Sequence, residues 1–191
     1  MAMEIAKAVL LSAFLLTLPN AKAQGIPPPV DLGIQNIPQQ TQVWCWAAVA
    51  QQIIAAAQGF QNTPQQCAMV AIANNVAPQY CCNMPQACMT TGSLQQIQAL
   101  ILNFGGHVSS IAPPADPMTI YNTLAAGHPI IMAVQTTPFA GHVVVLRGMQ
   151  WVPTQFGVQP VLLVNDPMGF FSQPIPFINL AQYWQAAIVV N

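Results

Sequence analysis

The succession of two hydrophobic patterns along the chain constrains its fold more than any other feature. Helical periodicity dominates up to Gly127, and short β-branched runs bounded by turn residues follow it. The predicted helices begin at Trp44, Thr63, Ser93 and Asp116, with a further short one around residues 179–183. The predicted strands are residues 129–135, 142–148, 161–165 and 187–190. Helices followed by strands indicate an α+β fold, in which an N-terminal helical half packs on a C-terminal antiparallel β-sheet.

Capping signals mark the starts of three of these helices. Thr63 and Gln66 form a predicted capping box, and Ser93 and Gln96 form a second one. Asp116 is expected to cap the fourth helix, because its carboxylate can accept hydrogen bonds from free N–H groups of the first turn. These polar residues set the predicted helix starts.

The first 23 residues have the three parts of a secretory signal peptide. Lys7 precedes an apolar run at residues 8–18, and the small-residue site Ala21-Lys22-Ala23 follows. The apolar run is too short for a comfortable membrane span, although an uncleaved N-terminal anchor is the alternative. We therefore expect residues 1–23 to be a signal peptide and the mature protein to be secreted or periplasmic.

The rest of the chain divides into an arm and one domain. Residues 24–38 contain Pro27-Pro28-Pro29 and Pro38, so this segment is expected to be extended rather than helical. No repeat and no second domain is evident after it. Residues 39–191 are therefore expected to form a single domain.

Charged side chains are scarce, and the loss of the leader makes them scarcer. Arg147 is then the only Lys or Arg, and the only acids are Asp31, Asp116 and Asp166. A nearly neutral surface offers no electrostatic attraction for nucleic acid or for an anionic membrane, so neither is an expected partner. No cofactor is expected, and the oligomeric state stays open.

The five cysteines fall into two groups. Cys67, Cys81, Cys82 and Cys88 lie within 22 residues, whereas Cys45 stands apart. In an exported protein this set predicts two disulfides and one free thiol. Adjacent Cys81 and Cys82 could pair only in a strained ring, so Cys67 is expected to take one of them and Cys88 the other, in either arrangement. A zinc site is the alternative, but the group contains no His and no paired C-x-x-C units.

Cys45 lies at the predicted start of a helix, where free N–H groups and the helix dipole favour a thiolate. A thiol nucleophile also needs a base. His142 begins the most apolar predicted strand, so a rigid element would hold it. His107 and His128 lie in turns, where a solvent-exposed role is the commoner one. His142 is therefore the predicted base.

The base in turn needs a hydrogen-bond acceptor that orients its ring. Asp31 lies in the arm and Asp116 is a predicted helix cap, whereas Asp166 ends a predicted strand. A hairpin of the two strands would bring Asp166 near His142. Asn165 could serve instead, since an amide oxygen also accepts, but strand alternation lets only one of the two point inward.

An oxyanion formed in acyl transfer needs two donors. The backbone N–H of Cys45 is one candidate, and a side-chain amide could be the second. Gln39, Gln40 and Gln42 all precede the helix. Composition does not choose among them.

Four stretches of the chain resemble papain-like cysteine peptidases, and most closely the small bacterial C39-like group. The resemblance spans nearly the whole mature chain. The matching stretches are QQTQVWCWAA at 39–48, CCNMPQAC at 81–88, GHVVV at 141–145 and NDP at 165–167.

The resemblance implies a papain-like domain that hydrolyses peptide bonds through a thioester. It implies that Gln39 donates to the oxyanion, Cys45 is the nucleophile, His142 is the base and Asp166 is its partner. The expected substrate is a peptide or protein, although deamidation or acyl transfer would use the same groups. Two alternatives stay open. One is an inactive secreted binding or effector module on this fold, and the other is a cell-wall amidase or endopeptidase.

Overall fold

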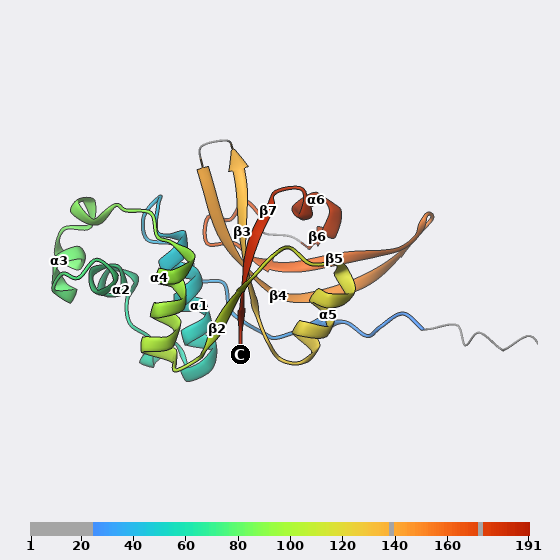
Figure 1. Ribbon diagram of the computed structural model, residues 1–191, viewed down its shortest axis with the longest axis horizontal. Coiled ribbons are helices and arrows are strands. Elements are labelled where there is room, and N and C mark those ends of the chain that lie inside the picture. The colour runs from blue at the N-terminus through green and yellow to red at the C-terminus, as the bar shows by residue number, and fades with distance from the viewer. Residues whose placement is uncertain (1–24, 138–139, 172–173) are drawn as a thin grey trace, which may run out of the picture.

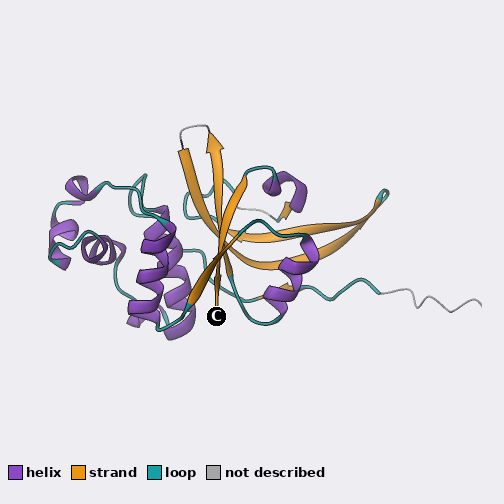
Figure 2. Cartoon of the chain, viewed as in Figure 1, coloured by secondary structure: helices purple, strands orange, loops and turns teal. Residues whose placement is uncertain are grey.

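The structure is a computed structural model that describes residues 25–137, 140–171 and 174–191. The predicted signal peptide lies outside these residues. None of the helices in the described part of the chain has the length and apolarity that a membrane crossing requires. Most of the helices gather on one side, and the strands lie on the other with two further helices beside them (Figure 2), so the predicted α+β fold is confirmed.

The helical half comprises short elements linked by tight turns. They are α1 (Cys45–Gln58), η1 (Phe60–Asn62), α2 (Gln66–Ala73), α3 (Pro78–Asn83), η2 (Pro85–Cys88), α4 (Leu94–Leu100) and the π-helical turn η3 (Ile101–Gly105). Two further helices, α5 (Pro117–Ala125) and α6 (Phe177–Ala181), lie on the sheet side. Short helices of this kind depend on tertiary packing for their stability.

The strands form one antiparallel sheet in the order β2-β7-β3-β4-β5-β6, and β1 pairs with β4 beside this path. Figure 1 shows β4 and β5 as a long hairpin that extends away from the helical half. The strands are β1 (Val30–Asp31), β2 (Ser109–Ala112), β3 (Ile130–Thr137), β4 (Ala140–Thr154), β5 (Gly157–Asn165), β6 (Ile175–Pro176) and β7 (Trp184–Val190). Strands β1, β2 and β6 are too short for a hydrophobic pattern in the sequence to predict them.

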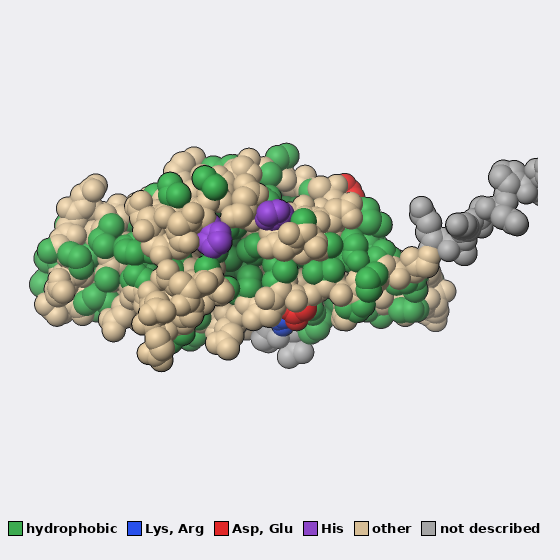
Figure 3. All heavy atoms as spheres, turned by 90° about the horizontal axis from the view of Figure 1, so that it is seen from below, with side chains coloured by type: hydrophobic (Ala, Val, Ile, Leu, Met, Phe, Trp, Pro, Cys, Tyr) green, Lys and Arg blue, Asp and Glu red, His purple; other side chains and the backbone are tan. Residues whose placement is uncertain are grey.

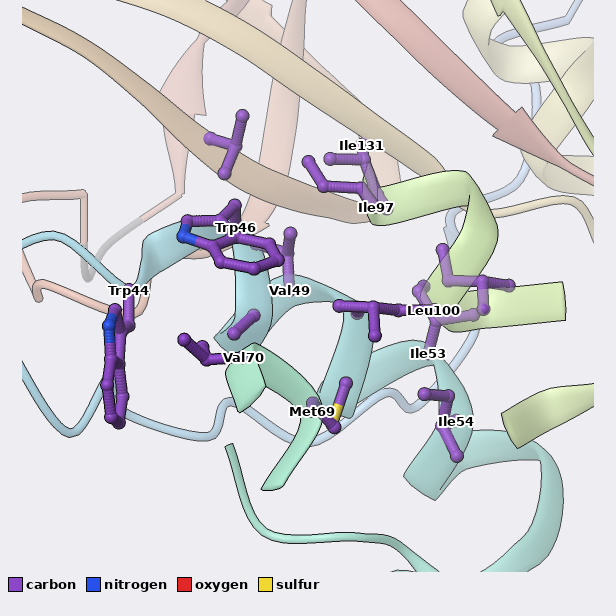
Figure 4. Close-up of a cluster of buried hydrophobic side chains, with 14 of the residues drawn as sticks. Trp44, Trp46, Val49, Ile53, Ile54, Met69, Val70, Ile97, Leu100 and Ile131 are labelled. Carbon is purple, nitrogen blue, oxygen red and sulfur yellow. The ribbon is translucent and has the colours of Figure 1, made fainter. Parts of the chain in front are cut away.

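Both faces of the sheet are buried. Along β4, Val143 and Val145 pack against the helical half, whereas Val144 and Leu146 pack into a second cluster with Ile120 of α5. Figure 4 shows the side chains of the first cluster converging from helices and sheet. Burial on both faces explains why these strands read as continuous apolar runs rather than alternating ones.

Two of the predicted helix caps are confirmed. The Ser93 hydroxyl accepts from the Gln96 N–H and the Gln96 side chain accepts from the Ser93 N–H, which is the reciprocal pair of a capping box. The Asp116 carboxylate accepts from the N–H groups of Met118 and Thr119. These caps need only groups within one helical turn, so sequence alone is sufficient to predict them.

The predicted capping box at Thr63 is wrong. Helix α2 begins at Gln66, and the Thr63 hydroxyl donates to the carbonyl of Gly59. The Gln66 side chain instead donates to the carbonyl of Pro38 at 2.9 Å and accepts from the N–H of Gln40 at 2.9 Å. Partners distant in sequence have replaced the local ones, because the buried Gln66 amide must be satisfied where it packs.

Most of the cysteine-rich segment between Cys81 and Cys88 is helical, because α3 and η2 occupy it. The predicted pattern of two disulfides and one free thiol is confirmed: Cys67 bonds Cys82, Cys81 bonds Cys88, and Cys45 is free. The first bridge joins α2 to α3, and the second joins α3 to η2.

Candidate active site

Cys45 is the first residue of α1, and both of its neighbours are anchored. The indole N–H of Trp44 donates to the carbonyl of Cys88 at 2.9 Å, and that of Trp46 donates to the carbonyl of Thr90 at 3.1 Å. Both indoles are buried. The start of the helix is thus tied to the segment that follows the Cys81–Cys88 disulfide, and the Cys45 thiol is held beside N–H groups that have no acceptor within the helix.

His142 lies on β4 and is 5% exposed. Its Nε2–H donates to the Oδ1 of Asp166 at 2.6 Å. The hairpin register explains this approach, because Val145 on β4 pairs with Asn165 on β5 and Asp166 follows directly. The structure therefore brings together the His and the Asp that the sequence singled out.

The Asp166 carboxylate also organises the turn that follows β5. Its Oδ1 accepts from the N–H of Met168 at 2.8 Å, and its Oδ2 accepts from the N–H of Phe171 at 2.9 Å. Burial would raise the pKa of Asp166, but the hydrogen bonds from His142, Met168 and Phe171 lower it below the usual 3.8. Residues 166–171, here called the Asp166 turn, thus surround an ionised carboxylate.

Asn165 was the alternative partner of the base, and its side chain is engaged elsewhere. Its Nδ2 donates to the carbonyl of Ile34 at 2.8 Å, and its Oδ1 accepts from the Nε of Arg147 at 3.1 Å. Arg147 also forms an ion pair with Asp31. The Arg147 hydrogen bond is the main cause that lowers the pKa of Asp31. Asn165 is therefore hydrogen-bonded to the arm, and Asp166 is hydrogen-bonded to His142.

The imidazole of His142 is strongly basic. Burial alone would lower its pKa, but hydrogen bonds with Asp166 and with the Cys45 side chain, and the charges of both groups, raise the pKa from 6.5 to about 9. Since Nε2 is bonded to Asp166, Nδ1 is the ring nitrogen left for the thiol. At neutral pH the ring is thus an imidazolium that can donate a proton.

The other two histidines are bonded to the C-terminal strand. The Nδ1–H of His107 donates to the carbonyl of Asn191 at 3.1 Å, and that of His128 donates to the carbonyl of Val190 at 3.1 Å. Neither lines the cleft that contains Cys45. Within the described residues, no group of three or more His, Cys, Asp or Glu side chains could hold a metal ion.

The three glutamines before α1 have different surroundings. The Gln39 Nε2 donates to the carbonyl of Thr41 at 2.6 Å, and its buried Oε1 has no partner among the described residues. The backbone of Gln40 is bonded to Gln66. Gln42 is exposed and lines the cleft beside Cys45. In the structure the Gln39 side-chain amide is thus hydrogen-bonded to the backbone two residues later.

Cys45 and His142 share a cleft of about 800 Å³. The helical half contributes Trp46 and the segment 91–94 to its lining, and the sheet half contributes residues of β3 and of the Asp166 turn. Among the described residues that line it, Cys45 and His142 are the ionisable ones. The face drawn in Figure 3 likewise carries few charged atoms. The Phe170 ring lies edge-on to His142, with ring centres 6.3 Å apart.

Gly92 lines the cleft, and the indole of Trp46 leaves no room for a side chain at this position. A Cβ at Gly92 would lie 2.2 Å from the Cδ2 of Trp46. The indole that is bonded to Thr90 therefore packs directly on the backbone two residues later. Sequence reasoning did not single out this position.

Sequence reasoning also did not anticipate that three glutamine side chains, Gln51, Gln52 and Gln66, are buried. The Gln66 Nε2 donates to the Oε1 of Gln51 at 2.9 Å, and the Gln52 Nε2 donates to the Oδ1 of Asn36 at 3.0 Å. A signal existed, since the pair Gln51-Gln52 interrupts the otherwise apolar helix α1. Buried polar groups need partners, so such a pair indicates contacts with another segment.

Comparison with known proteins gives a consistent result. Residues 31–188 match the family model described as the Peptidase_C39 like family. No curated protein sequence matches.

Several solved structures have a similar fold. The peptidase domain of Streptococcus ComA, a bi-functional ABC transporter involved in quorum sensing, is 17% identical with a TM-score of 0.56, covering 82% of this chain and 97% of that one. A putative C39-like peptidase from Bacillus anthracis is 12% identical with a TM-score of 0.54, covering 86% and 98%. The proform of the ragweed pollen cysteine protease Amb a 11 is 14% identical with a TM-score of 0.53, covering 87% and 66%. At these identities the likeness is one of fold.

Proposed function

Because the chain belongs to the Peptidase_C39 like family, we propose that it is an exported cysteine peptidase that hydrolyses peptide bonds. One observation carries the proposal. The free thiol of Cys45 at a helix start shares a cleft with His142, whose Nε2 is bonded to the buried carboxylate of Asp166. A nucleophile, a base and a group that orients the base are the components that acyl transfer requires.

In the proposed reaction, the Cys45 thiolate attacks the carbonyl carbon of the scissile amide. The His142 imidazolium donates its Nδ1 proton to the leaving amine, and the C–N bond breaks to leave a thioester. Neutral His142 then takes a proton from water, which attacks the thioester and releases the acid. Asp166 remains ionised throughout and keeps the ring in one tautomer.

The oxyanion of both steps needs two donors. The Cys45 N–H begins the helix and lacks an acceptor within it, so it supplies one. Gln39 supplies the second when its Nε2 exchanges the Thr41 carbonyl for the oxyanion. We expect Gln39→Ala to lower kcat by about 100-fold, whereas Gln42→Ala, which changes an exposed side chain in the cleft, leaves kcat within about threefold.

The substrate is proposed to be a peptide or protein segment without charge at the scissile bond. Apart from Cys45 and His142, the described lining residues are uncharged, and many are apolar. A charged side chain buried there would lack a partner and would bind poorly. Oppositely charged substrate series therefore offer a direct test of selectivity.

Export is proposed from two independent features. Residues 1–23 have the signal-peptide pattern, and two disulfides link the cysteine-rich segment. Disulfides form and persist in oxidising compartments such as the periplasm or the outside of the cell. Mass analysis of the protein recovered from its native compartment should give a chain that begins at Gln24.

The decisive experiment compares the native protein with Cys45→Ala in digestion of a peptide library and in labelling by a thiol-directed affinity reagent. We expect Cys45→Ala to lose both turnover and labelling, because the other four cysteines are bonded in pairs. Turnover by Cys45→Ala would contradict the proposal. Cleavage of purified peptidoglycan but of no library peptide would indicate a cell-wall enzyme, and a native thiol that labels only at alkaline pH would indicate an inactive module.

A further inference from the structure

The arm has a second connection to the site that the proposed mechanism does not use. Residues 34–40, here called the arm segment, are hydrogen-bonded on one side to the end of β5 and the Asp166 turn, and on the other side to α1 and α2. The nucleophile belongs to α1, and the partner of the base belongs to the Asp166 turn. The arm segment therefore links the supports of the two reacting groups.

Toward the sheet, the arm segment bonds three consecutive residues. The Nδ2 of Asn36 donates to the backbone carbonyl of Asp166 at 2.9 Å. The N–H of Gln39 donates to the carbonyl of Pro167 at 3.1 Å. On the other flank of Asp166, the Asn165 side chain donates to the arm at 2.8 Å. The backbone of the residue that orients His142 is thus held on both sides.

Toward the helices, Gln52 makes the link. It lies seven residues after Cys45 on α1 and is 1% exposed. Its Nε2 donates to the Oδ1 of Asn36 at 3.0 Å and to the carbonyl of Ile37 at 3.1 Å. A buried amide that loses its partners costs free energy, so these bonds hold the arm segment in one position.

We propose that Asn36 is a positioning residue for the His142–Asp166 pair, which it joins to the nucleophile helix through Gln52. The proposal rests on the proposed function, because it assigns Asn36 a role in that same site. Asn36 acts through its two ends: the amide oxygen accepts from Gln52, and the amide nitrogen donates to Asp166. A carboxylate cannot donate and an aliphatic side chain can do neither, so an amide fits this place.

The position of the Asp166 backbone governs the geometry of the base. The carbonyl that Asn36 holds also accepts from the N–H of Gly169 at 3.1 Å, which closes the Asp166 turn. The carboxylate of the same residue lies 2.6 Å from the Nε2 of His142. Releasing the carbonyl lets this short bond lengthen, and a weaker bond lowers the pKa of His142.

The test is a cycle of Asn36→Ala, Gln52→Met and the double variant, with Gln35→Ala as the matched control. Gln35 and Asn36 are exposed neighbours on the same arm segment, but the hydrogen bonds to Asp166 and Gln52 are made by Asn36. We expect Asn36→Ala to lower kcat by about fivefold to tenfold with KM within about twofold, and to move the alkaline limb of the pH profile to lower pH. The double variant should lose less than the product of the two single losses, because both act through one link. Gln35→Ala should behave as the native protein.

A second readout does not depend on turnover. The rate of Cys45 alkylation by iodoacetamide between pH 5 and 9 reports the thiolate that His142 supports. A native protein whose thiol reacts only above about pH 8 would overturn the proposed function, and with it the positioning role. If the native thiol reacts at pH 6 but Asn36→Ala has the kcat and the pH profile of the native protein, the positioning role alone is overturned. If Asn36→Ala unfolds, Asn36→Ser provides the same comparison, because it also removes the amide that accepts from Gln52.

Discussion

The helical half and the sheet half support their reacting groups in different ways. His142 lies in the β3–β4 ladder, where it stands opposite Val134, and three residues later β4 also pairs with β5. Cys45 lies at the start of a helix among short helical elements that share no ladder. Its surroundings are held by the two disulfides and by indole hydrogen bonds.

The two reacting groups are thus positioned by two kinds of framework. A strand is held by repeated backbone hydrogen bonds to its neighbours, whereas short helices depend on tertiary contacts for their stability. In the sheet half, effects on His142 should therefore come from its ladder partners, from Asp166 and from the arm segment that is bonded to the Asp166 turn. In the helical half, changes far from the thiol should also reach it.

The largest expected effect is that of Asp166→Ala in the sheet half. Without the carboxylate, His142 loses the group that orients its ring and raises its pKa, so kcat should fall by about 100-fold or more. Asp116→Ala is the matched control, because it removes the same charge from an exposed helix cap. It should lower the stability of the protein slightly, through the lost helix cap, and leave kcat unchanged. Equal kcat losses in the two variants would contradict the assignment.

The next effect concerns the pH dependence of stability. The pKa of His142 is about 9 in the folded protein against 6.5 for an ordinary histidine, so its charged form is bound more tightly when folded. This contribution, on the order of 3 kcal/mol, is complete below pH 6.5 and is lost as the pH rises from 6.5 through about 9. The lowered pKa of Asp166 has the opposite consequence: its contribution is present above pH 3.8 and is lost on acidification below it.

Denaturant unfolding of the native protein and of His142→Gln, from pH 5 to 9.5, measures the contribution of His142 to the free energy of unfolding. Stability of the native protein should fall across the alkaline part of the range, and that of His142→Gln should fall less. His107→Gln, which changes a histidine outside the cleft, should retain the native slope. The same slope in His142→Gln would show that another group causes it.

A somewhat smaller effect is expected from the disulfides of the helical half. The double variant Cys81→Ala/Cys88→Ala opens a loop with a sequence separation of 7, which should cost about 2–3 kcal/mol. Because Trp44 donates to the Cys88 carbonyl, kcat/KM should fall as well. Thermal unfolding and steady-state kinetics measure the two effects.

The matched control is Cys67→Ala/Cys82→Ala. This bridge closes a longer loop, with a separation of 15, but neither cysteine accepts an indole hydrogen bond. It should lower the melting temperature at least as much while changing kcat/KM less. If both pairs reduce kcat/KM equally, the helical half responds as one unit and the indole bonds carry no special role.

Many local features of this protein can be predicted from its sequence. The Ser93 and Asp116 caps, the start of α1 at Cys45 and the main strands follow from contacts within a turn or from hydrophobic period. The candidate catalytic residues could also be identified from the sequence, because few other ionisable side chains are available for these roles. Local hydrogen bonding and the need to bury apolar runs act within a few residues, so they leave a visible pattern.

Tertiary structure alone decided what depends on distant partners. It bonded the Asn165 side chain to the arm and to Arg147, paired Cys67 with Cys82, and bonded Gln66 to Pro38 of the arm instead of to a helix cap. It also placed Asn36 between Gln52 and the Asp166 turn. A buried amide or carboxylate must find its partner wherever the chain folds back to it, and that position is set by packing rather than by spacing along the sequence.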